Sequence, residues 1–263
     1  MMFTGLVIWG AAATLMLLLW LWQIRSKDAS VVDVAWAYAV GSAACIALAI
    51  GDGDAGRRAA LAVLAAAWSL RLGTHLLVDR ILKAKGEDSR YRTWRESCGP
   101  RWNTVALGFF QAQAVFVVIF ALPAIAGAAD QRPFGVWTDY LALALWGTGL
   151  IWECTADSQL ARWRRDPANA GRTCRAGVWR FSRHPNYFGE WLQWLAWPLL
   201  AVASPWGWWI ALHPLVVLIF LLYLTGIPHT ERRALLSRGD DYRRYQSSTS
   251  AFFPWPPRPE TKP

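Results

Sequence analysis

Forty consecutive residues, from Trp191 to Thr230, contain no Asp, Glu, Lys or Arg. As one α-helix this stretch would be roughly 60 Å long, about twice the ~30 Å hydrocarbon core of a bilayer. The turn signal Ser204-Pro205-Trp206-Gly207 divides it near the middle and predicts two spans. Two further charge-free stretches run from Met1 to Ile24 and from Trp102 to Ala129. The chain is therefore predicted to be a polytopic membrane protein.

Composition excludes several other classes of protein. The 55% of hydrophobic residues exceeds the roughly 45–50% of soluble domains, which argues against a soluble single-core enzyme and against a disordered protein. The four cysteines show neither CxxC spacing nor an evident pairing, which indicates reduced or membrane-buried thiols rather than a secreted disulfide scaffold. No charge precedes Ile24, and this run is longer than the ~7–15 residues of a signal-peptide core, so it is predicted to remain as a membrane helix.

The apolar segments predict an all-α fold with seven transmembrane helices. The predicted spans cover residues 3–24, 34–51, 59–78, 104–127, 135–154, 187–203 and 206–227. The fifth span contains Asp139 and is the least apolar of the set. No internal repeat and no soluble domain is evident, so residues 1–263 are predicted to form a single membrane-embedded domain. The aromatic, Pro-rich segment 252–257 is predicted to lie along the membrane surface.

Basic residues are distributed unevenly between the predicted loops. Four alternate loops hold 23 of the 27 Lys and Arg residues, the other loops hold three, and Arg71 lies within the third span. Positive charge is retained on the cytoplasmic side, so the N-terminus is predicted to be periplasmic and the C-terminus cytoplasmic, in a bacterial inner membrane. Because no nucleic-acid-binding module accompanies these charges, no nucleic-acid partner is predicted. A monomer is expected.

Several polar side chains fall inside the predicted spans, where ionisable groups are costly and mark candidate sites. Arg71 lies roughly 10 Å inside the cytoplasmic end of its span, and His75 follows on the same helix face. The same half of the bundle is predicted to hold a further set of polar residues, namely Asp33, Gln111, Gln113, Glu153, Glu190 and Gln193. Their clustering predicts a pocket open to the cytoplasm. The alternative is that Arg71 only holds the bundle together.

The segment before the sixth span is rich in arginine. Seven Arg lie between Arg162 and Arg183, interrupted by Pro and Gly, and paired guanidinium N–H groups match phosphate oxygens. Topology and contact with anionic lipid head groups are the alternative explanation. No strand precedes a GxGxxG motif, and Gly147-Thr148-Gly149 falls in a span, where small residues permit close helix packing. His184 has no metal-ligand neighbours at suitable spacing, so no metal site is predicted.

Residues Ser182 to Glu190 read SRHPNYFGE. With the Arg-rich segment before it and the Trp-rich span after it, this run resembles the steroid 5α-reductase superfamily, particularly its uncharacterised bacterial branch. The resemblance covers most of the chain, including the sequence DVAW at 33–36, GIP at 226–228, Tyr242 and Tyr245. Isoprenylcysteine carboxyl methyltransferases and sterol reductases carry similar runs, so the motif does not specify the reaction.

The resemblance implies a seven-helix enzyme in which NADPH enters from the cytoplasm and a hydrophobic substrate arrives from the bilayer. It places the cofactor in a C-terminal part, at about residues 135–257. The implied cofactor-binding residues are Asp157, Arg164, Arg172, Arg175, Asn186 and Tyr187. Candidate catalytic residues are Asp33, Arg71, His75 and Glu190. The substrate pocket is expected to include Trp68, Gln111 and Gln193.

One position departs from the pattern of these reductases. They carry a Tyr three residues before an Arg in the third span, where it helps to polarise an enone carbonyl. If that Arg corresponds to Arg71, the Tyr is replaced by Trp68, whose indole N–H donates a hydrogen bond but no proton. Either His75 or Asp33 then supplies the proton, or the substrate is not a steroid enone.

Three functions follow from these observations. The first is an NADPH-dependent reductase of a conjugated C=C bond. The second is a methyltransferase that uses S-adenosylmethionine, a cofactor without the phosphates of NADPH and therefore with less need of the Arg-rich segment. The third is a non-enzymatic protein that binds or transports lipids. That function would require polar groups through the whole membrane thickness, which the bias to one half does not provide.

The predicted topology is testable with reporter fusions. An alkaline phosphatase fused after Pro263 is expected to be inactive, and a fluorescent protein at the same position is expected to fluoresce, because the C-terminus is predicted to be cytoplasmic. The control is the same pair of reporters placed between Gly51 and Arg57, where the opposite result is expected. Phosphatase activity after Pro263 alone would reverse the topology.

Overall fold

The structure is a computed structural model that describes residues 1–84, 86–224 and 226–259, and over these residues it contains helices and no strand. It divides into two compact units. The first consists of Met1–Phe134 with Ala201–Ile210, and the second of Gly135–Leu200 with Ala211–Pro263. Gly135 is also where the sequence predicts the cofactor-binding part to begin. The basic residues Lys85 and Lys262 of the charge count lie outside the described residues.

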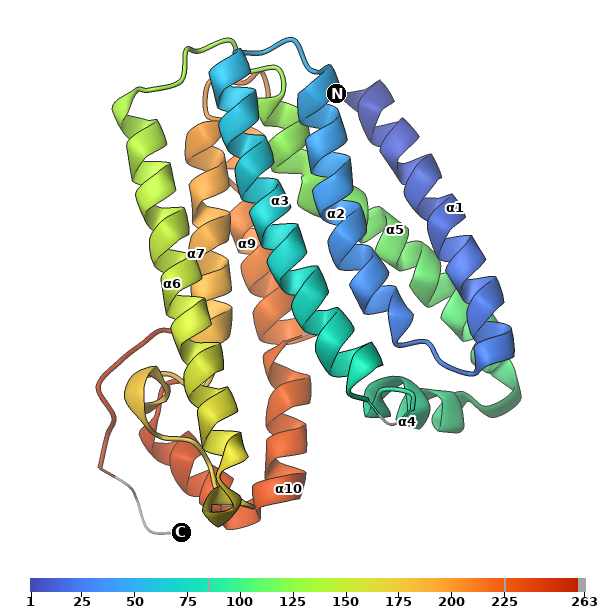
Figure 1. Ribbon diagram of the computed structural model, residues 1–263, viewed down its shortest axis with the longest axis vertical. Coiled ribbons are helices and arrows are strands. Elements are labelled where there is room, and N and C mark those ends of the chain that lie inside the picture. Colours follow the sequence, from blue (N-terminus) through green and yellow to red (C-terminus); the bar gives the residue numbers. More distant parts are fainter. Residues whose placement is uncertain (85, 225, 260–263) are drawn as a thin grey trace. The chain divides into compact units, whose positions relative to one another are not determined.

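Four long helices form most of the first unit. They are α1 (Met2–Ser26), α2 (Val31–Ile50), α3 (Ala55–Leu77) and α5 (Trp102–Gly127). A π-helical turn, Val78–Leu82, extends α3, and two short helices, α4 (Ser89–Cys98) and α8 (Gly207–Ile210), complete the unit. Helix α2 packs against both α3 and α5, and α1 packs against α5 (Figure 1).

Small residues bring α2 and α3 together. A Cβ atom at Gly41 would lie 2.1 Å from the Ser69 Cβ, so only glycine fits there. Ser69 also donates a hydrogen bond of 2.9 Å to the Ala37 carbonyl across the same contact. The outward side of α1, by contrast, exposes large apolar side chains, with Phe3 80% and Leu18 59% exposed. Such a surface suits contact with lipid rather than water.

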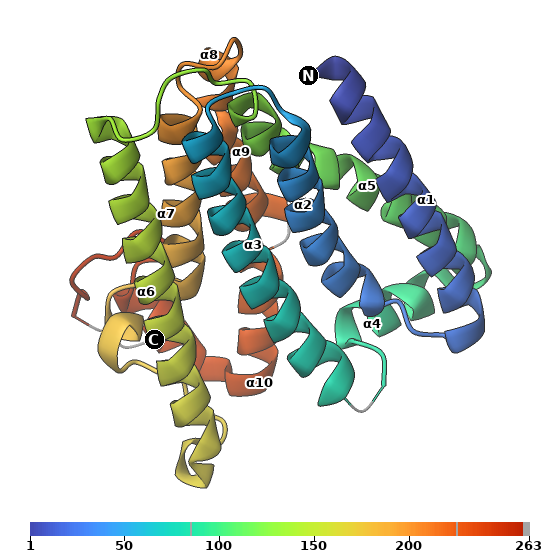
Figure 2. The same ribbon diagram turned by 45° about the horizontal axis from the view of Figure 1, so that its top comes forward.

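The second unit is built on α6 (Trp137–Arg165), α7 (Pro185–Leu200), α9 (His213–Ile219) and α10 (Ile227–Ser248). A π-helical turn, Phe220–Leu224, lies between α9 and α10. Two 3₁₀ turns, Pro167–Asn169 and Gly177–Arg180, lie in the segment between α6 and α7. Helices α6 and α7 run side by side in Figures 1 and 2, and α7 also packs on α9.

Two glycines set the distance between α6 and α7. A Cβ atom at Gly149 would lie 2.6 Å from the Gly189 carbonyl oxygen, and one at Gly189 would lie 2.7 Å from the Glu153 backbone nitrogen. The two backbones are therefore in direct contact, as the small residues in this predicted span indicated. The contact places Glu153 and Asp157 of α6 opposite the beginning of α7.

Among the residues that the structure describes, five segments are long and apolar enough to cross a membrane. They are Met2–Ser26, Val31–Ile50, Ala55–Leu82, Ser89–Gly127 and Gly207–Ser248. Within the last, residues 207–224 carry no charge, whereas α10 carries eight charged residues and is a polar extension. Helix α7 has only 16 residues, or about 24 Å, and α6 contains Asp139, Glu153 and Asp157. The structure thus supports a polytopic membrane protein, and the count of seven spans stays a prediction.

Three details differ from the sequence predictions. Helix α6 continues to Arg165, so the first arginines of the Arg-rich segment are helical. The helix ends just before Pro167, where the residue ahead of a proline leaves the helical conformation. Asp139 is not a charge inside a span, because it accepts the backbone N–H groups of Gly135 (2.8 Å) and Val136 (3.2 Å) and caps α6. Phe252 is buried rather than spread on a membrane surface.

The glycine contact predicts opposite outcomes for two neighbouring positions of α6. Gly149→Ala is expected to lower the free energy of unfolding by about 1–3 kcal/mol, because the new methyl group meets the α7 backbone. Gly147→Ala is the control, since no atom lies within 4 Å of its Cβ position. Thermal unfolding in detergent measures both, and equal melting temperatures would contradict the close approach.

Candidate functional site

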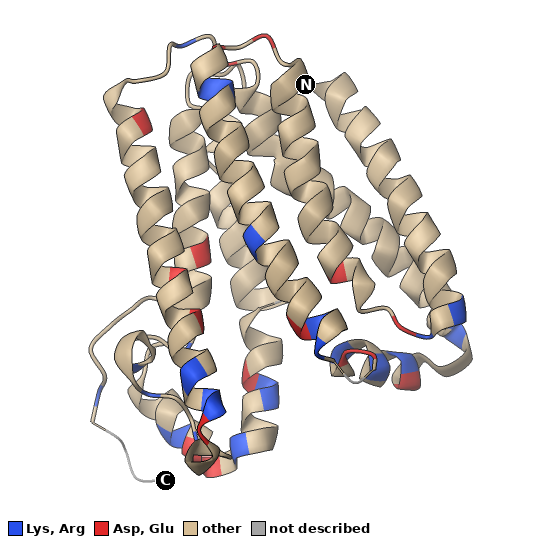
Figure 3. Cartoon of the chain, viewed as in Figure 1, with Lys and Arg blue, Asp and Glu red and all other residues tan. Residues whose placement is uncertain are grey.

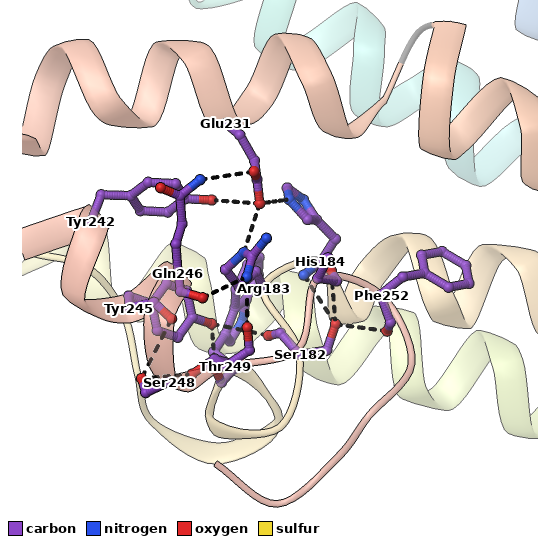
Figure 4. A network of polar contacts seen from close by, with 12 residues as sticks. Ser182, Arg183, His184, Glu231, Tyr242, Tyr245, Gln246, Ser248, Thr249 and Phe252 are labelled. Atoms are coloured by element: carbon purple, nitrogen blue, oxygen red, sulfur yellow. Dashed lines mark hydrogen bonds and ion pairs between the residues drawn. The ribbon is translucent and has the colours of Figure 1, made fainter. Parts of the chain in front are cut away.

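The first residues of the SRHPNYFGE run contact the carboxylate of Glu231, which lies on α10 (Figure 4). Arg183 donates from Nε to the Glu231 Oε1 at 2.6 Å, and His184 Nε2 lies 3.3 Å from the same oxygen. Gln246 donates to the other oxygen, Oε2, at 2.9 Å, and the Tyr242 hydroxyl lies 3.4 Å from Oε1. Glu231 therefore gathers four side chains at the entrance of α7.

The charges in this network follow from its contacts. Burial opposes ionisation of Glu231, but the hydrogen bonds from His184 and Arg183 outweigh it and lower its pKa to about 2. Burial lowers the pKa of His184 from its usual value, although Glu231 acts in the opposite direction. The imidazole is therefore neutral near pH 7, and the ion pair is between Glu231 and Arg183.

The C-terminal tail fastens the same segment. Arg183 donates from its guanidinium to the carbonyls of Gln246 (3.1 Å) and Thr249 (2.6 Å). Tyr245 donates from its hydroxyl to the carbonyls of Trp179 and Ser182, and Ser182 Oγ donates to the Phe252 carbonyl at 2.8 Å (Figure 4). Arg183 and His184 are thus structural residues of the motif. Tyr242 and Tyr245 help to hold the segment before α7 in place.

The second half of the motif faces different partners. Asn186 donates from Nδ2 to the Asp157 Oδ1 of α6 at 3.2 Å. The Tyr187 hydroxyl lies 3.1 Å from Thr230 Oγ1, and its ring stacks on His184 with 5.4 Å between centroids. Asp157 and Asn186, which the resemblance assigns to the cofactor, therefore lie together, with Tyr187 beside them.

Further along α7 the side chain of Glu190 is partly buried and that of Gln193 is fully buried. Glu190 Oε1 accepts the indole N–H of Trp194 at 2.8 Å. Gln193 is 1% exposed and donates to Glu153 Oε2 at 2.7 Å across the contact between α6 and α7. Gln193 was predicted to line a substrate pocket, and in the structure its amide joins two helices. Glu153 and Gln193 form a buried polar pair in the second unit.

Figure 3 marks the Lys and Arg residues of the chain in blue. The arginines of the Arg-rich segment fall into two groups according to their partners. Arg175 donates to the Asp241 side chain at 3.1 Å and to its backbone carbonyl at 2.8 Å, and Arg183 is held by Glu231. The remaining five have no hydrogen-bond or ion-pair partner among residues 1–84, 86–224 and 226–259, and all five are exposed: Arg162, Arg164, Arg165, Arg172 and Arg180. Arg164 and Arg172 are thus available for an anionic ligand, whereas Arg175 already has a structural anion.

Asp33 is held in an ion-pair network of the first unit. It accepts Arg90 at 2.6 Å and the Tyr91 hydroxyl at 2.6 Å, and it also pairs with Arg80. Two guanidinium groups stabilise the carboxylate, so the interpretation of Asp33 as a protonated acid in a dry pocket does not fit the structure. The proton in this hydrogen bond is carried by Tyr91, which is 4% exposed.

The other predicted residues of the first unit have diverse surroundings. Trp68 is 3% exposed and packs edge-on against Trp36 with 6.1 Å between ring centroids. Gln111 donates to the Ala13 carbonyl at 3.2 Å and so fastens α5 to α1. His75 is half-exposed and lies 3.5 Å from Asp79, so it is not in a dry pocket. Arg71 is partly buried.

Glu231, which holds the start of the motif in place, is the residue of this region that the sequence patterns did not point to. It is the only acidic residue between Glu190 and Asp240, a stretch that otherwise reads as membrane span and basic tail. An isolated acidic residue in such a stretch indicates that its carboxylate needs a partner of opposite charge. Its partners, however, lie 47 and 48 residues earlier in the chain, and sequence spacing does not indicate that pairing.

Comparison with known proteins identifies the family. Residues 19–249 match the family described as protein of unknown function DUF1295. The chain belongs to this family. DUF1295 is part of the steroid 5α-reductase-like group, which confirms the resemblance at that level. A relative, an uncharacterised protein of Schizosaccharomyces pombe, is 27% identical over 95% of this chain and 76% of its own length.

The Glu231 network predicts a large loss of stability from one substitution. Glu231→Gln is expected to lower the free energy of unfolding by about 1.5–3 kcal/mol, because a partly buried guanidinium loses its charged partner. The control Asp240→Asn removes an acid that is 69% exposed and paired with Arg243, and is expected to change it by less than about 0.5 kcal/mol. Chemical unfolding in detergent compares the two.

The difference in stability between the wild type and Glu231→Gln is expected to depend on pH. Because the folded pKa of Glu231 is about 2 and its ordinary value is 4.5, its contribution is complete above about pH 4.5 and disappears as the pH falls towards 2. The stability gap between the wild type and Glu231→Gln is therefore expected to narrow in that window. A gap that stayed constant down to pH 2 would contradict an ionised Glu231.

Proposed function

We propose that this protein is a membrane-embedded, NADPH-dependent reductase of a conjugated C=C bond in a hydrophobic substrate. One observation carries the proposal: the second unit joins Asp157 to Asn186 at 3.2 Å and leaves Arg164 and Arg172 exposed, with no hydrogen-bond or ion-pair partner among the described residues. A polar clamp between α6 and α7, with guanidinium groups near the end of α6 and in the segment that follows it, suits a cofactor with several phosphates. The family relationship agrees with this assignment.

The residues present fit NADPH as a ligand. Arg164 and Arg172 would hold its phosphates, and Asp157, Asn186 and Tyr187 would hold its remaining polar groups, with Glu190 one turn further along α7. When bound, the cofactor supplies a hydride to the β-carbon of the double bond. The role of the protein is to orient the cofactor and the double bond and to exclude water.

The substrate side is assigned from the resemblance to residues of the first unit. In this proposal Arg71 and the Trp68 indole N–H stabilise negative charge on the substrate carbonyl. The proton would come from the Tyr91 hydroxyl, which Asp33 orients, rather than from Asp33 itself. The substrate would be steroid-, prenol- or lipid-like and enter from the bilayer. The cofactor site would face the cytoplasm of a bacterial inner membrane.

A methyltransferase that uses S-adenosylmethionine is the principal competing function. That cofactor carries no phosphate, so five exposed arginines that have no partner among the described residues are more positive charge than it needs. A lipid-binding protein without catalytic activity would bind neither cofactor. Measurement of cofactor binding therefore separates the three possibilities.

The decisive experiment is cofactor binding to the purified, full-length protein in detergent. NADPH is expected to raise the melting temperature and S-adenosylmethionine is not. Arg164→Ala combined with Arg172→Ala is expected to weaken NADPH binding on the order of 100-fold, because two charge-assisted contacts are lost. Arg25→Ala, an exposed arginine of α1, is the control and is expected to bind as the wild type. Stabilisation by S-adenosylmethionine alone would defeat the reductase proposal.

A further inference from the structure

A cavity lies at one end of the first unit, where three helices meet. The beginning of α1, the end of α2 and the end of α5 surround a volume of about 310 Å³, which is at the lower limit of small-molecule sites. The cavity is open rather than enclosed, and the residues assigned above to the cofactor and the substrate are not part of its lining. Most of its walls are apolar, and they are formed by Met1, Ala47, Ile50, Ile125, Ala128 and Ala129.

Two loops close this end of the unit in a fixed arrangement. Gly53 donates its backbone N–H to the Ala128 carbonyl at 2.9 Å, and Gln131 donates from Nε2 to the Asp52 carbonyl at 2.9 Å. A Cβ atom at Gly51 would lie 2.4 Å from the Ala128 carbonyl oxygen, so this close approach requires glycine. The wall that carries Asp52 is therefore held through its backbone, and its position does not depend on the Asp52 carboxylate.

Two polar side chains, Thr4 and Asp52, complete the lining of the cavity. Neither the Thr4 hydroxyl nor the exposed Asp52 carboxylate has a hydrogen-bond or ion-pair partner within residues 1–84, 86–224 and 226–259. The neighbouring acids differ, because Asp54 caps α3 by accepting the Arg57 backbone N–H at 2.8 Å. Asp130 lies 3.8 Å from the buried Arg57 guanidinium. Among the described residues at this end of the unit, Asp52 is thus the carboxylate available to an external cation.

The length of α2 indicates how deep these groups lie in a bilayer. Its 20 residues, from Val31 to Ile50, extend for about 30 Å, which equals the thickness of the hydrocarbon core. Asp52 lies two residues beyond the end of this helix, so its carboxylate reaches the level of the lipid head groups. Ile50 and Ala47 lie at the level of the acyl chains. The cavity therefore combines an apolar wall with an anionic group at the depths where a phospholipid has its chains and its head group.

We propose that this cavity binds a phospholipid with a primary-amine head group, phosphatidylethanolamine. Its ammonium group pairs with the Asp52 carboxylate, the Thr4 hydroxyl donates to a phosphate oxygen, and part of one acyl chain packs against Ile50 and Ile125. The anionic head group of phosphatidylglycerol has no cation to offer Asp52 and is repelled by it. The quaternary ammonium of phosphatidylcholine is a cation without an N–H donor. The site is independent of the proposed reductase function.

The test measures dissociation constants of the purified, full-length protein for the three lipids by native mass spectrometry in detergent. The wild type is expected to bind phosphatidylethanolamine about three-fold more tightly than phosphatidylcholine, because one partly solvated ion pair is gained. Asp52→Asn is expected to abolish this preference. Glu96→Gln, which neutralises an exposed acid of α4, is the matched control and is expected to retain it. Equal affinities in the wild type, or a preference that survives in Asp52→Asn, would overturn the inference.

A second measurement separates binding from a structural role of Asp52. In detergent without lipid, Asp52→Asn is expected to melt at the same temperature as the wild type, because its carboxylate has no partner to lose among the described residues. Added phosphatidylethanolamine is expected to raise the melting temperature of the wild type more than that of Asp52→Asn. A lower melting temperature of Asp52→Asn without lipid would show that the carboxylate stabilises the chain itself, which contradicts the inference.

Two further results would assign the cavity to another occupant. Ala129→Leu places a larger apolar side chain in the cavity and is expected to weaken the binding of phosphatidylethanolamine. Ethanolamine alone is expected to produce no thermal shift, and a shift that requires Asp52 would assign the site to a soluble amine. A dimer in the mass spectrum that Asp52→Asn or Ala129→Leu abolishes would assign it to a second copy of this chain. Either result overturns the inference.

Discussion

The entrance to α7 depends on the carboxylate of Glu231. It is a single charge at the beginning of α10, and it holds Arg183 and His184 from the segment before α7 together with Gln246 from the end of its own helix. Without that anion the Arg183 guanidinium would be a partly buried cation, and the cost of leaving such a group unpaired is larger than the gain from most neutral hydrogen bonds. Because α7 begins at Pro185, this ion pair also determines where Asn186 and Tyr187 lie relative to α6. The C-terminal tail adds further hydrogen bonds to the same turn.

The arginines of the Arg-rich segment have two different roles. Arg175 and Arg183 are matched to Asp241 and Glu231, so they neutralise charges of the protein itself. Within the part of the chain that the structure describes, Arg164 and Arg172 have no such partner and are exposed, which is the arrangement expected of groups that bind an external anion. A count of positive charges does not distinguish the two roles, because every arginine contributes equally to the count. The acidic residues of α10 make the distinction, and they lie more than 40 residues further along the chain.

The sequence indicated which residues of the candidate site lie together only where the resemblance assigned them as a set. Asp157 and Asn186 were assigned together from the resemblance, and they do form a hydrogen bond. Asp33 was expected to be a protonated acid in a dry pocket, but its carboxylate pairs with Arg80 and Arg90, which approach from beyond the end of α3 and from α4. Gln111 and Gln193 were expected in a pocket, yet each amide joins two helices. A polar residue in an apolar segment signals that it needs a partner, but it does not identify the partner.

The sequence by itself indicated an all-helical membrane protein, because 40 residues without a charge suit membrane helices, which satisfy their own backbone hydrogen bonds. It also located the SRHPNYFGE run and the small residues around Gly149 that permit close helix packing. Only the tertiary structure decided which charges are paired, since ion pairs such as Arg183 with Glu231 join segments that are distant in the chain. For the same reason, only the tertiary structure distinguishes the exposed arginines of this segment from those that are paired with acidic residues of α10.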